Sequence, residues 1–187
     1  MHTAFIGIGS NLGNRLANCE AAISLLSQDG LIKNIIKSRW YETAPLLFPD
    51  KCRTLIGEKG RKVSDTCIPH YINGAIKLST SLSPADLLRL TQSIETKLGR
   101  VRTDKKWEPR TVDLDILFYD DLIIDTPSLK IPHPELHKRM FVLRPLCDIA
   151  PTFVYPVLNK TVQKLLLSLR ANEVNEAIQF VKKIASA

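Results

Sequence analysis

Apolar and polar residues alternate along four stretches of the chain, and this pattern predicts β-strands. Successive side chains of a strand point to opposite faces, so a strand that covers a core alternates with a period of two. The second stretch is also rich in β-branched and aromatic residues, which favour strands. The predicted strands span residues 3–10, 31–43, 72–78 and 112–119.

Apolar residues at helical spacing follow the first strand and predict a helix. Leu16, Cys19, Ile23 and Leu26 recur at intervals of three and four residues, which places them on one side of a helix. Gly30 lies just beyond this stripe. We expect Gly30 to end the helix in the left-handed conformation, which glycine adopts without steric cost.

Capping residues predict a second helix after the third strand. Ser83 is followed by Pro84, which suits a first helical turn, and Asp86 stands three residues after Ser83. Gly99 is expected to end this helix. The residues expected to face the core are Leu87, Thr91, Ile94 and Leu98.

The order of these elements is βαββαβ, which predicts an α+β fold with a mainly antiparallel sheet and helices packed against it. Leu165, Leu169 and the apolar residues within 174–184 suggest additional C-terminal helices. Residues 47–70 carry several Lys and Arg residues without apolar periodicity and predict an extended basic loop. A length of 187 residues with 44% apolar content suits one buried core, so we expect a single domain over residues 1–187.

Two aspartates interrupt the fourth predicted strand. With a strict period of two, Asp113 and Asp115 share one face with Leu117 and Tyr119, and the other face carries Val112, Leu114, Ile116 and Phe118. Two charges about 7 Å apart on one strand face repel by about 2 kcal/mol at an effective dielectric of 20. Two interpretations fit this pair, either a solvated strand face or a site for a divalent cation such as Mg²⁺, which prefers oxygen ligands.

Cations cluster immediately before the aspartates. Five of them lie within eleven residues, and guanidinium and ammonium groups bind phosphate oxygens. The pattern therefore places phosphate-binding groups beside carboxylates that suit a metal. The five cations are Arg100, Arg102, Lys105, Lys106 and Arg110.

Net charge and cysteine spacing narrow the class of protein. The formal net charge of +7 favours anionic partners without choosing among them. The N-terminus has no basic region before an apolar run, and no stretch approaches the roughly 18 apolar residues of a membrane span. Four cysteines without paired spacing argue against a zinc site or a disulfide framework. We therefore expect a cytoplasmic protein with reduced thiols.

Several motifs together resemble the signature of the 6-hydroxymethyl-7,8-dihydropterin pyrophosphokinase family. The resemblance implies transfer of a pyrophosphoryl group from ATP to a pterin alcohol in folate biosynthesis, giving AMP and the pterin diphosphate. It also implies a ferredoxin-like βαββαβ core. The motifs that carry it are residues 8–14, 71–75, 99–102, 107–119, 132–139 and 150–151.

The resemblance implies roles for residues around the aspartate strand. Asp113 and Asp115 match the ligands of two Mg²⁺ ions that bridge the phosphates of the co-substrate ATP. Arg100 and Arg110 match catalytic arginines that neutralise charge on the transferred group. Gln92 and Glu95 match nucleotide contacts, but a solvated face of the second helix explains both equally well. The remaining matches to nucleotide contacts are Arg102, Lys106, Trp107, Ile116, His133 and Arg139.

The implied pterin contacts lie on the first three strands and near the C-terminal third. Asn73 can pair its amide with the ring edge, and Tyr71 and Phe141 can stack on the ring, although core packing is an alternative for both aromatic residues. The other implied contacts are Gly9, Thr43, Ala44 and Leu46.

The resemblance implies ATP and a dihydropterin as small-molecule partners, with no nucleic acid and no membrane. It leaves open fusion to, or association with, dihydropteroate synthase, the next enzyme of the pathway. Glu108 departs from the family pattern, which has glycine or alanine before Pro-Arg, and a carboxylate there disfavours tight ATP binding unless it points outward or pairs with Lys105 or Lys106.

Two other functions fit parts of the same pattern. A nucleotidyltransferase also combines a Gly-Ser turn with an Asp-x-Asp strand, but about a hundred residues separate the two here. A basic βαββαβ chain also fits an RNA-binding sheet, which needs an aromatic-rich strand for base stacking. Asp113 and Asp115 would repel RNA from that strand.

Overall fold

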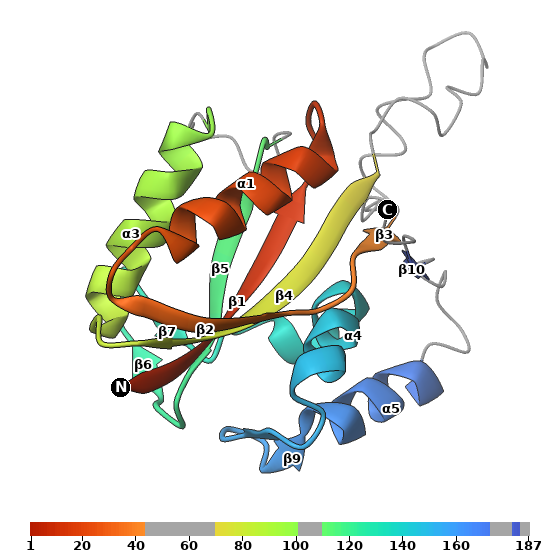
Figure 1. The fold of residues 1–187 in the computed structure, drawn as a ribbon. Coiled ribbons are helices and arrows are strands. Elements are labelled where there is room, and N and C mark those ends of the chain that lie inside the picture. Colours follow the sequence, from red (N-terminus) through yellow and green to blue (C-terminus); the bar gives the residue numbers. More distant parts are fainter. Residues whose placement is uncertain (44–69, 101–109, 173–180, 184–187) are drawn as a thin grey trace, which may run out of the picture.

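A six-stranded antiparallel sheet forms the centre of the computed structural model, which describes residues 1–43, 70–100, 110–172 and 181–183 (Figure 1). Its strands follow the order β10-β3-β4-β1-β5. Strand β2 also pairs with β4, at residues 76–80, whereas β3 pairs with residues 71–73. This arrangement confirms the predicted α+β fold and the βαββαβ order. The strands are β1 (His2–Ser10), β2 (Ile32–Lys37), β3 (Tyr41–Thr43), β4 (Tyr71–Thr80), β5 (Asp113–Tyr119) and β10 (Val181–Lys183).

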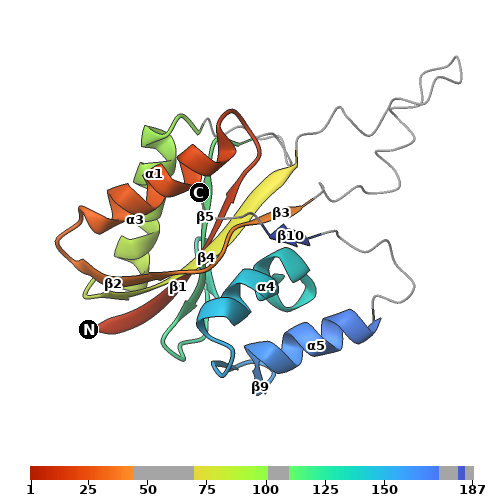
Figure 2. The same cartoon turned by 45° about the vertical axis from the view of Figure 1, so that its right-hand side comes forward.

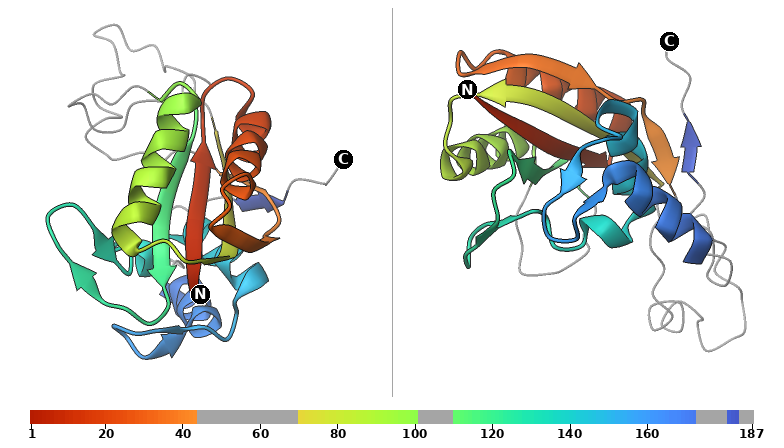
Figure 3. Two further views of the ribbon diagram at one scale, coloured as in Figure 1. Left: turned by 60° about the vertical axis from the view of Figure 1, so that its left-hand side comes forward. Right: turned by 90° about the horizontal axis from the view of Figure 1, so that it is seen from below.

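Helices cover both faces of this sheet. On one face, α1 (Arg15–Ser27) and α3 (Pro84–Lys97) lie side by side across β1 and β5 (Figure 3, left). On the opposite face, α4 (Met140–Ile149) and α5 (Val162–Asn172) pack together (Figure 2). The short elements are β6 (Ile124–Asp125), β7 (Lys130–Ile131), the 3-10 helix η2 (Leu136–Lys138), β8 (Val154–Tyr155) and β9 (Lys160–Thr161).

Each face of the sheet has its own apolar core. Ile6, Ile76 and Leu114 pack with buried residues of α1 and α3 on one side. Phe5 and Phe118 meet edge to face on the other side, with ring centroids 5.8 Å apart. They join Leu117, Leu143, Leu146, Leu165 and Leu166 in the cluster under α4 and α5.

The end of α1 and the strand that follows differ from the predictions. The helix ends at Ser27 with Gln28 as a right-handed cap, so Gly30 is not its left-handed stop. Leu16, expected in the apolar stripe, is exposed, whereas Cys19 and Leu26 are buried as predicted. The single strand predicted over residues 31–43 is divided into β2 and β3 at residues 38–40, where Ser38 bonds to Ala75 of β4 through its backbone N and its side chain. Within β2, Asn34 takes a left-handed φ of 53°, and the register with β4 shifts between Lys33 and Ile36.

The predicted caps of α3 are confirmed. The Ser83 side chain accepts a hydrogen bond from Asp86 N at 3.2 Å, and Pro84 opens the first turn. Gly99 has a φ of 85°, so it turns the chain away from the helix as expected. Leu87, Thr91 and Ile94 are buried, and Leu98 packs at the margin of the core.

A β-bulge in β5 corrects the predicted faces of that strand. Ile116 pairs with Ile6, but Phe118 pairs with Phe5, so one extra residue lies between these two pairs. Phe118 therefore lies on the face of Leu117, and Tyr119 lies on the opposite face with Ile116. The prediction assumed strict alternation, which a bulge breaks. The faces of the aspartates precede the bulge and agree with the prediction.

The C-terminal third is only partly as predicted. Helix α5 contains Leu165 and Leu169 and confirms one additional helix. Within residues 174–184 the structure describes Val181–Lys183, which is strand β10 paired with β3 and not a helix. Helix α4 was not predicted, because its short apolar run fits a strand or a helix and Pro145 lies inside it.

The predictions about the cysteines and about the basic loop can be compared with the structure only in part. Cys19 and Cys147 are thiols and form no disulfide within the described part of the chain. The loop predicted at 47–70 lies outside the described residues except for His70, and so do Cys52 and Cys67. No helix among the residues that the structure describes is both long and apolar enough to cross a membrane.

Gly74 allows close packing between β4 and Trp40. An added Cβ at this position would overlap the ring of Trp40, which is 8% exposed. The indole Nε1 of Trp40 donates to Glu20 Oε1 on α1 at 2.8 Å, so the ring has a second constraint. Only glycine therefore fits between β4 and this indole.

Gly74→Ala is expected to lower the free energy of unfolding by about 1–3 kcal/mol, the usual cost of overpacking a core. Gly30→Ala is the matched control, because no atom lies within 4 Å of its added Cβ. Urea denaturation measures both variants. Equal midpoints for Gly74→Ala and the control would contradict the packing argument.

Candidate active site

Asp113 and Asp115 lie where β5 begins, on the sheet face that α4 and α5 cover further along. Asp113 is paired across the sheet with Gly9, which is paired in turn with Asn73 on β4. Cross-strand partners project to the same face. Since Gly9 has no side chain, it leaves an open strip of backbone between Asp113 and Asn73, and an added Cβ would lie 3.2 Å from Asn73 Oδ1.

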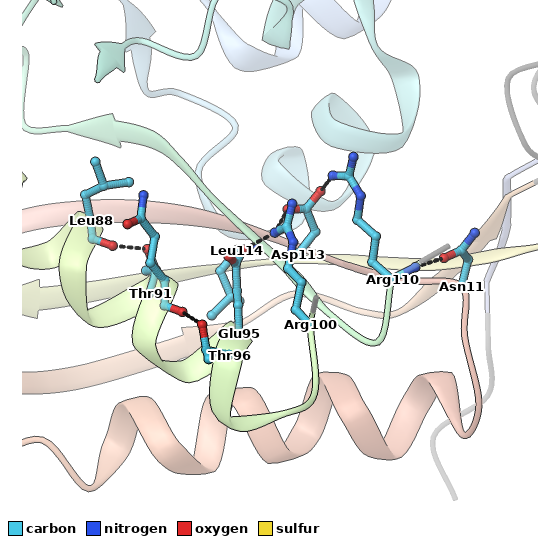
Figure 4. A network of polar contacts seen from close by, with 10 residues as sticks. Asn11, Leu88, Thr91, Glu95, Thr96, Arg100, Arg110, Asp113 and Leu114 are labelled. Atoms are coloured by element: carbon cyan, nitrogen blue, oxygen red, sulfur yellow. Dashed lines mark hydrogen bonds and ion pairs between the residues drawn. The ribbon is translucent and has the colours of Figure 1, made fainter. Parts of the chain in front are cut away.

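Two arginines from separate segments converge on Asp113 (Figure 4). Arg100 Nη1 donates to Asp113 Oδ1, and Arg110 Nη1 donates to Asp113 Oδ2. The Asp113 side chain is 23% exposed, so these ion pairs lie partly out of water. Burial lowers the pKa of Arg100, but the charges of Asp113 and Glu95 outweigh that effect and raise it above its ordinary value.

Glu95 is a buried part of this network. The sequence also allowed a place on a solvated face of the helix, and the structure does not support that alternative. Glu95 is 2% exposed, and its Oε1 accepts from Leu114 N of β5 at 2.8 Å. The same oxygen accepts from Arg100 Nη1. The Glu95 carboxylate therefore links α3 to the backbone of β5.

Asn11 holds the other arginine, a role that the sequence pattern alone does not predict. Its Oδ1 accepts from Arg110 N at 2.7 Å, and its own N donates to Arg110 O at 3.2 Å. Asn11 is 2% exposed. A buried asparagine in the Ser-Asn-Leu-Gly turn was the available signal, but its partner lies 99 residues away in the chain.

Asp115 lies next to this network without joining it. It forms no hydrogen bond or ion pair with any residue that the structure describes. Burial, followed by the negative charges of Asp113 and Glu95, raises the pKa of Asp115 to about 7. Part of the Asp115 residue is exposed, so repulsion from these like charges contributes alongside burial.

The proposed pterin contacts on β3 and β4 lie beside the aspartates. Asn73 Nδ2 donates to Thr43 Oγ1 at 2.8 Å, and both residues are buried. Tyr71 is paired with Thr43 and is partly exposed. Burial raises the pKa of Tyr71, and the positive charge of Arg110 acts against this shift.

The segment that leads into α4 and the first turn of that helix contribute three more candidates. His133 is partly buried, and its N donates to Leu117 O at 3.1 Å, which fixes it beside β5. Burial and then the charge of Arg139 lower the pKa of His133, so it is neutral at pH 7. The guanidinium of Arg139 lies 5.8 Å from the ring centroid of Phe141.

The other candidates are not brought together in this way. Gln92 is partly exposed on α3, and the Ile116 side chain is 5% exposed within the core, which leaves only its backbone for a ligand. The described residues contain no group of three or more His, Cys, Asp or Glu side chains that could hold a metal ion. The candidates that lie outside the described residues are Ala44, Leu46, Arg102, Lys106 and Trp107.

Two arginines that converge on Asp113, beside the second carboxylate of Asp115 and on an antiparallel α+β fold, are typical of a phosphoryl-transfer enzyme. The family model for 7,8-dihydro-6-hydroxymethylpterin-pyrophosphokinase (HPPK) matches residues 5–151, and the chain belongs to this family. The activity is the transfer of pyrophosphate from ATP to hydroxymethyldihydropterin in folate biosynthesis. This assignment favours the pyrophosphokinase interpretation over the nucleotidyltransferase and the RNA-binding module.

Relatives of two lengths match the chain. The 2-amino-4-hydroxy-6-hydroxymethyldihydropteridine pyrophosphokinase of Synechocystis is 39% identical over 88% of this chain and 75% of its own length. The same enzyme of Bacillus subtilis is 38% identical over 78% of this chain and 77% of its own length. Folic acid synthesis protein fol1 of Schizosaccharomyces pombe is 34% identical over 96% of this chain, which spans only 22% of that protein.

A solved structure has the same fold. The wild-type Plasmodium falciparum HPPK-DHPS matches with a TM-score of 0.69 and 18% sequence identity. The match covers 92% of this chain and 45% of that chain. At this identity the similarity establishes the fold alone.

Asn11→Ala is expected to misplace Arg110, because the Arg110 backbone loses its acceptor. An unpaired buried donor costs about 1–3 kcal/mol. Asn14→Ala is the matched control: Asn14 lies in the same turn and caps α1 through a 3.2 Å hydrogen bond from Ala17 N. That cap contributes about 1 kcal/mol.

Both variants should therefore lose stability in urea denaturation, but only Asn11→Ala should slow turnover at saturating substrates. Equal turnover by the two variants would show that Asn11 supports the fold alone.

Proposed function

We propose that pyrophosphoryl transfer takes place at the start of β5 and depends on Mg²⁺ held by Asp113 and Asp115. The observation that carries this proposal is the convergence of Arg100 and Arg110 on Asp113, beside a carboxylate that has no partner among the described residues. In the reaction, the pterin hydroxyl oxygen bonds to the β-phosphorus of ATP. The bond from that phosphorus to the α–β bridging oxygen breaks, AMP leaves, and the hydroxyl proton is released.

The residues present fit a hard cation. Asp115 is partly exposed, and its pKa is raised first by burial and then by the like charges of Asp113 and Glu95. A bound cation would relieve the repulsion between these charges. Two carboxylates leave most of the coordination shell to water and phosphate, as Mg²⁺ prefers beside a nucleotide. Two Mg²⁺ ions would neutralise phosphate charge there. To serve as a ligand, Asp113 must exchange at least one arginine contact for the metal.

The arginines fit the role of charge-stabilising groups. Arg100 and Arg110 have two and one carboxylate partners, respectively, among the described residues. Arg100 must exchange an ion pair with Asp113 for one with phosphate, so its net contribution to ground-state ATP binding is small. Its effect then falls on the transition state, where charge develops.

The pterin fits the open strip across β1. We propose that Asn73, held by Thr43, pairs with the ring edge above Gly9, and that Tyr71 and Phe141 stack on the ring. His133 and Arg139 would contact the nucleotide, with Gln92 and the Ile116 backbone as further contacts. Ala44, Leu46, Arg102, Lys106 and Trp107 complete the proposal from the family resemblance alone.

The longer relatives support a partner as well as substrates. We propose that this activity is associated with dihydropteroate synthase, because the chain matches less than half of the Plasmodium HPPK-DHPS and 22% of fol1. ATP and the dihydropterin are the small-molecule partners.

Asp115→Asn is expected to leave folding intact and to reduce turnover below about a tenth of the wild-type rate at saturating Mg²⁺, since positioning losses alone often exceed tenfold. Asp125→Asn is the control, because Asp125 pairs with Lys130 on the β6–β7 hairpin and its side chain is 75% exposed. A Mg²⁺ titration of turnover measures both. An Asp115→Asn rate above that tenth would count against Asp115 as a ligand.

Arg100→Ala should slow the chemical step at least about a hundredfold, on the scale of losing one preorganised charge-stabilising donor. The dissociation constant for ATP should change only a few-fold, because the ion pair with phosphate replaces one with Asp113. Arg110→Ala should lose both rate and affinity. Single-turnover kinetics with equilibrium ATP binding separate these effects. A hundredfold loss of ATP affinity at an unchanged rate would make Arg100 a binding residue.

A further inference from the structure

Arg100 is held by a second carboxylate that the proposed reaction does not use. Its Nη1 contacts both Asp113 and Glu95, from β5 and α3 respectively. If Asp113 becomes a metal ligand, as the proposed function requires, Glu95 is the remaining described carboxylate on this guanidinium. We infer that Glu95 is a positioning residue that holds Arg100 at the reaction centre and acts through Arg100, not through the nucleotide.

Glu95 is itself fixed on the strand that carries the aspartates. Its Oε1 accepts from Leu114 N at 2.8 Å, and Leu114 lies between Asp113 and Asp115. The carboxylate is thus set at the level of the proposed ligands, although its backbone belongs to α3. A hydrogen bond from a backbone amide to a carboxylate is charge-assisted and fixes its direction.

The backbone of Arg100 is tied to Glu95 as well. Arg100 N donates to Glu95 O at 3.0 Å, after Gly99 turns the chain with a φ of 85°. The guanidinium then returns along α3 to the Glu95 side chain (Figure 4). Contacts at both ends leave Arg100 little freedom to move away when Asp113 is withdrawn from it.

Charge gives Glu95 a role that an uncharged side chain could not fill. A cation on Asp113 and Asp115 would repel Arg100, and Glu95 supplies a compensating negative charge on the side of α3. The Glu95 side chain is 3% exposed, whereas Asp113 is 23% exposed. So little exposed surface fits an internal anchor better than the nucleotide contact that the family resemblance implies.

A double-mutant cycle tests this inference, because coupled residues do not have additive effects. The variants are Glu95→Gln, Arg100→Ala and the two combined. The amide introduced by Glu95→Gln keeps an oxygen that can accept from Leu114 N, so the substitution removes only the charge. Each variant is measured by single-turnover rate and by equilibrium binding of α,β-methylene ATP with Mg²⁺, which cannot transfer its pyrophosphoryl group.

Glu95→Gln should slow the chemical step about tenfold in the wild-type background and not at all in the Arg100→Ala background. Its affinity for the analogue should stay within about threefold of wild type, because the ground state gains little from Arg100. Glu20→Gln is the matched control, since Glu20 also accepts from a cation and an N–H group, Lys37 Nζ at 2.7 Å and Trp40 Nε1 at 2.8 Å. It should leave rate and affinity unchanged.

Equal slowing by Glu95→Gln in both backgrounds, or an equal loss of analogue affinity in both, would overturn the inference and make Glu95 a nucleotide contact. Urea denaturation checks folding, and Glu95→Asp, which keeps the charge but shortens the reach, replaces Glu95→Gln in the same cycle if that variant does not fold. Failure of the proposed function would look different, because Arg100→Ala alone would then retain the wild-type rate.

Discussion

Charge neutralisation at Asp113 is the interaction on which the arrangement of the site depends. Asp113, Asp115 and Glu95 bring three carboxylates to one end of β5, and each would raise the energy of the others without cations between them. Arg100, which follows α3, and Arg110, which leads into β5, supply those cations. The site is therefore held together by the same groups that the proposed reaction uses.

Buried polar anchors make this convergence possible. Arginine loses considerable side-chain freedom when it is fixed, so a guanidinium rarely stays in place through one exposed contact. Glu95 and Asn11 are each 2% exposed. Glu95 accepts from the guanidinium of Arg100, and Asn11 accepts from the backbone N of Arg110. The two arginines are thus parts of the α3–β5 and β1–β5 connections as well as parts of the site.

The sequence predicted those features that depend on local pattern. The strands, the Ser83 cap, the Gly99 stop and the shared face of Asp113 and Asp115 follow from spacing within a few residues. Long-range contacts had no such signal: Asn11 meets Arg110 99 residues away, and Glu95 falls on the polar side of a helical pattern until β5 is placed beside it. The extra residue in β5 was also invisible, because a bulge is defined by the partner strand and not by alternation alone.

That bulge divides β5 into two halves of opposite phase. Before it, the strand directs Asp113 and Asp115 toward the face of the proposed reaction. After it, Phe118 points to that same face and joins the aromatic cluster beneath α4 and α5. A single continuous strand can therefore present carboxylates to solvent and an aromatic ring to the core on one side of the sheet. The groups of the proposed reaction therefore lie in the first half of β5, and the aromatic ring that packs the core on the same side of the sheet lies in its second half.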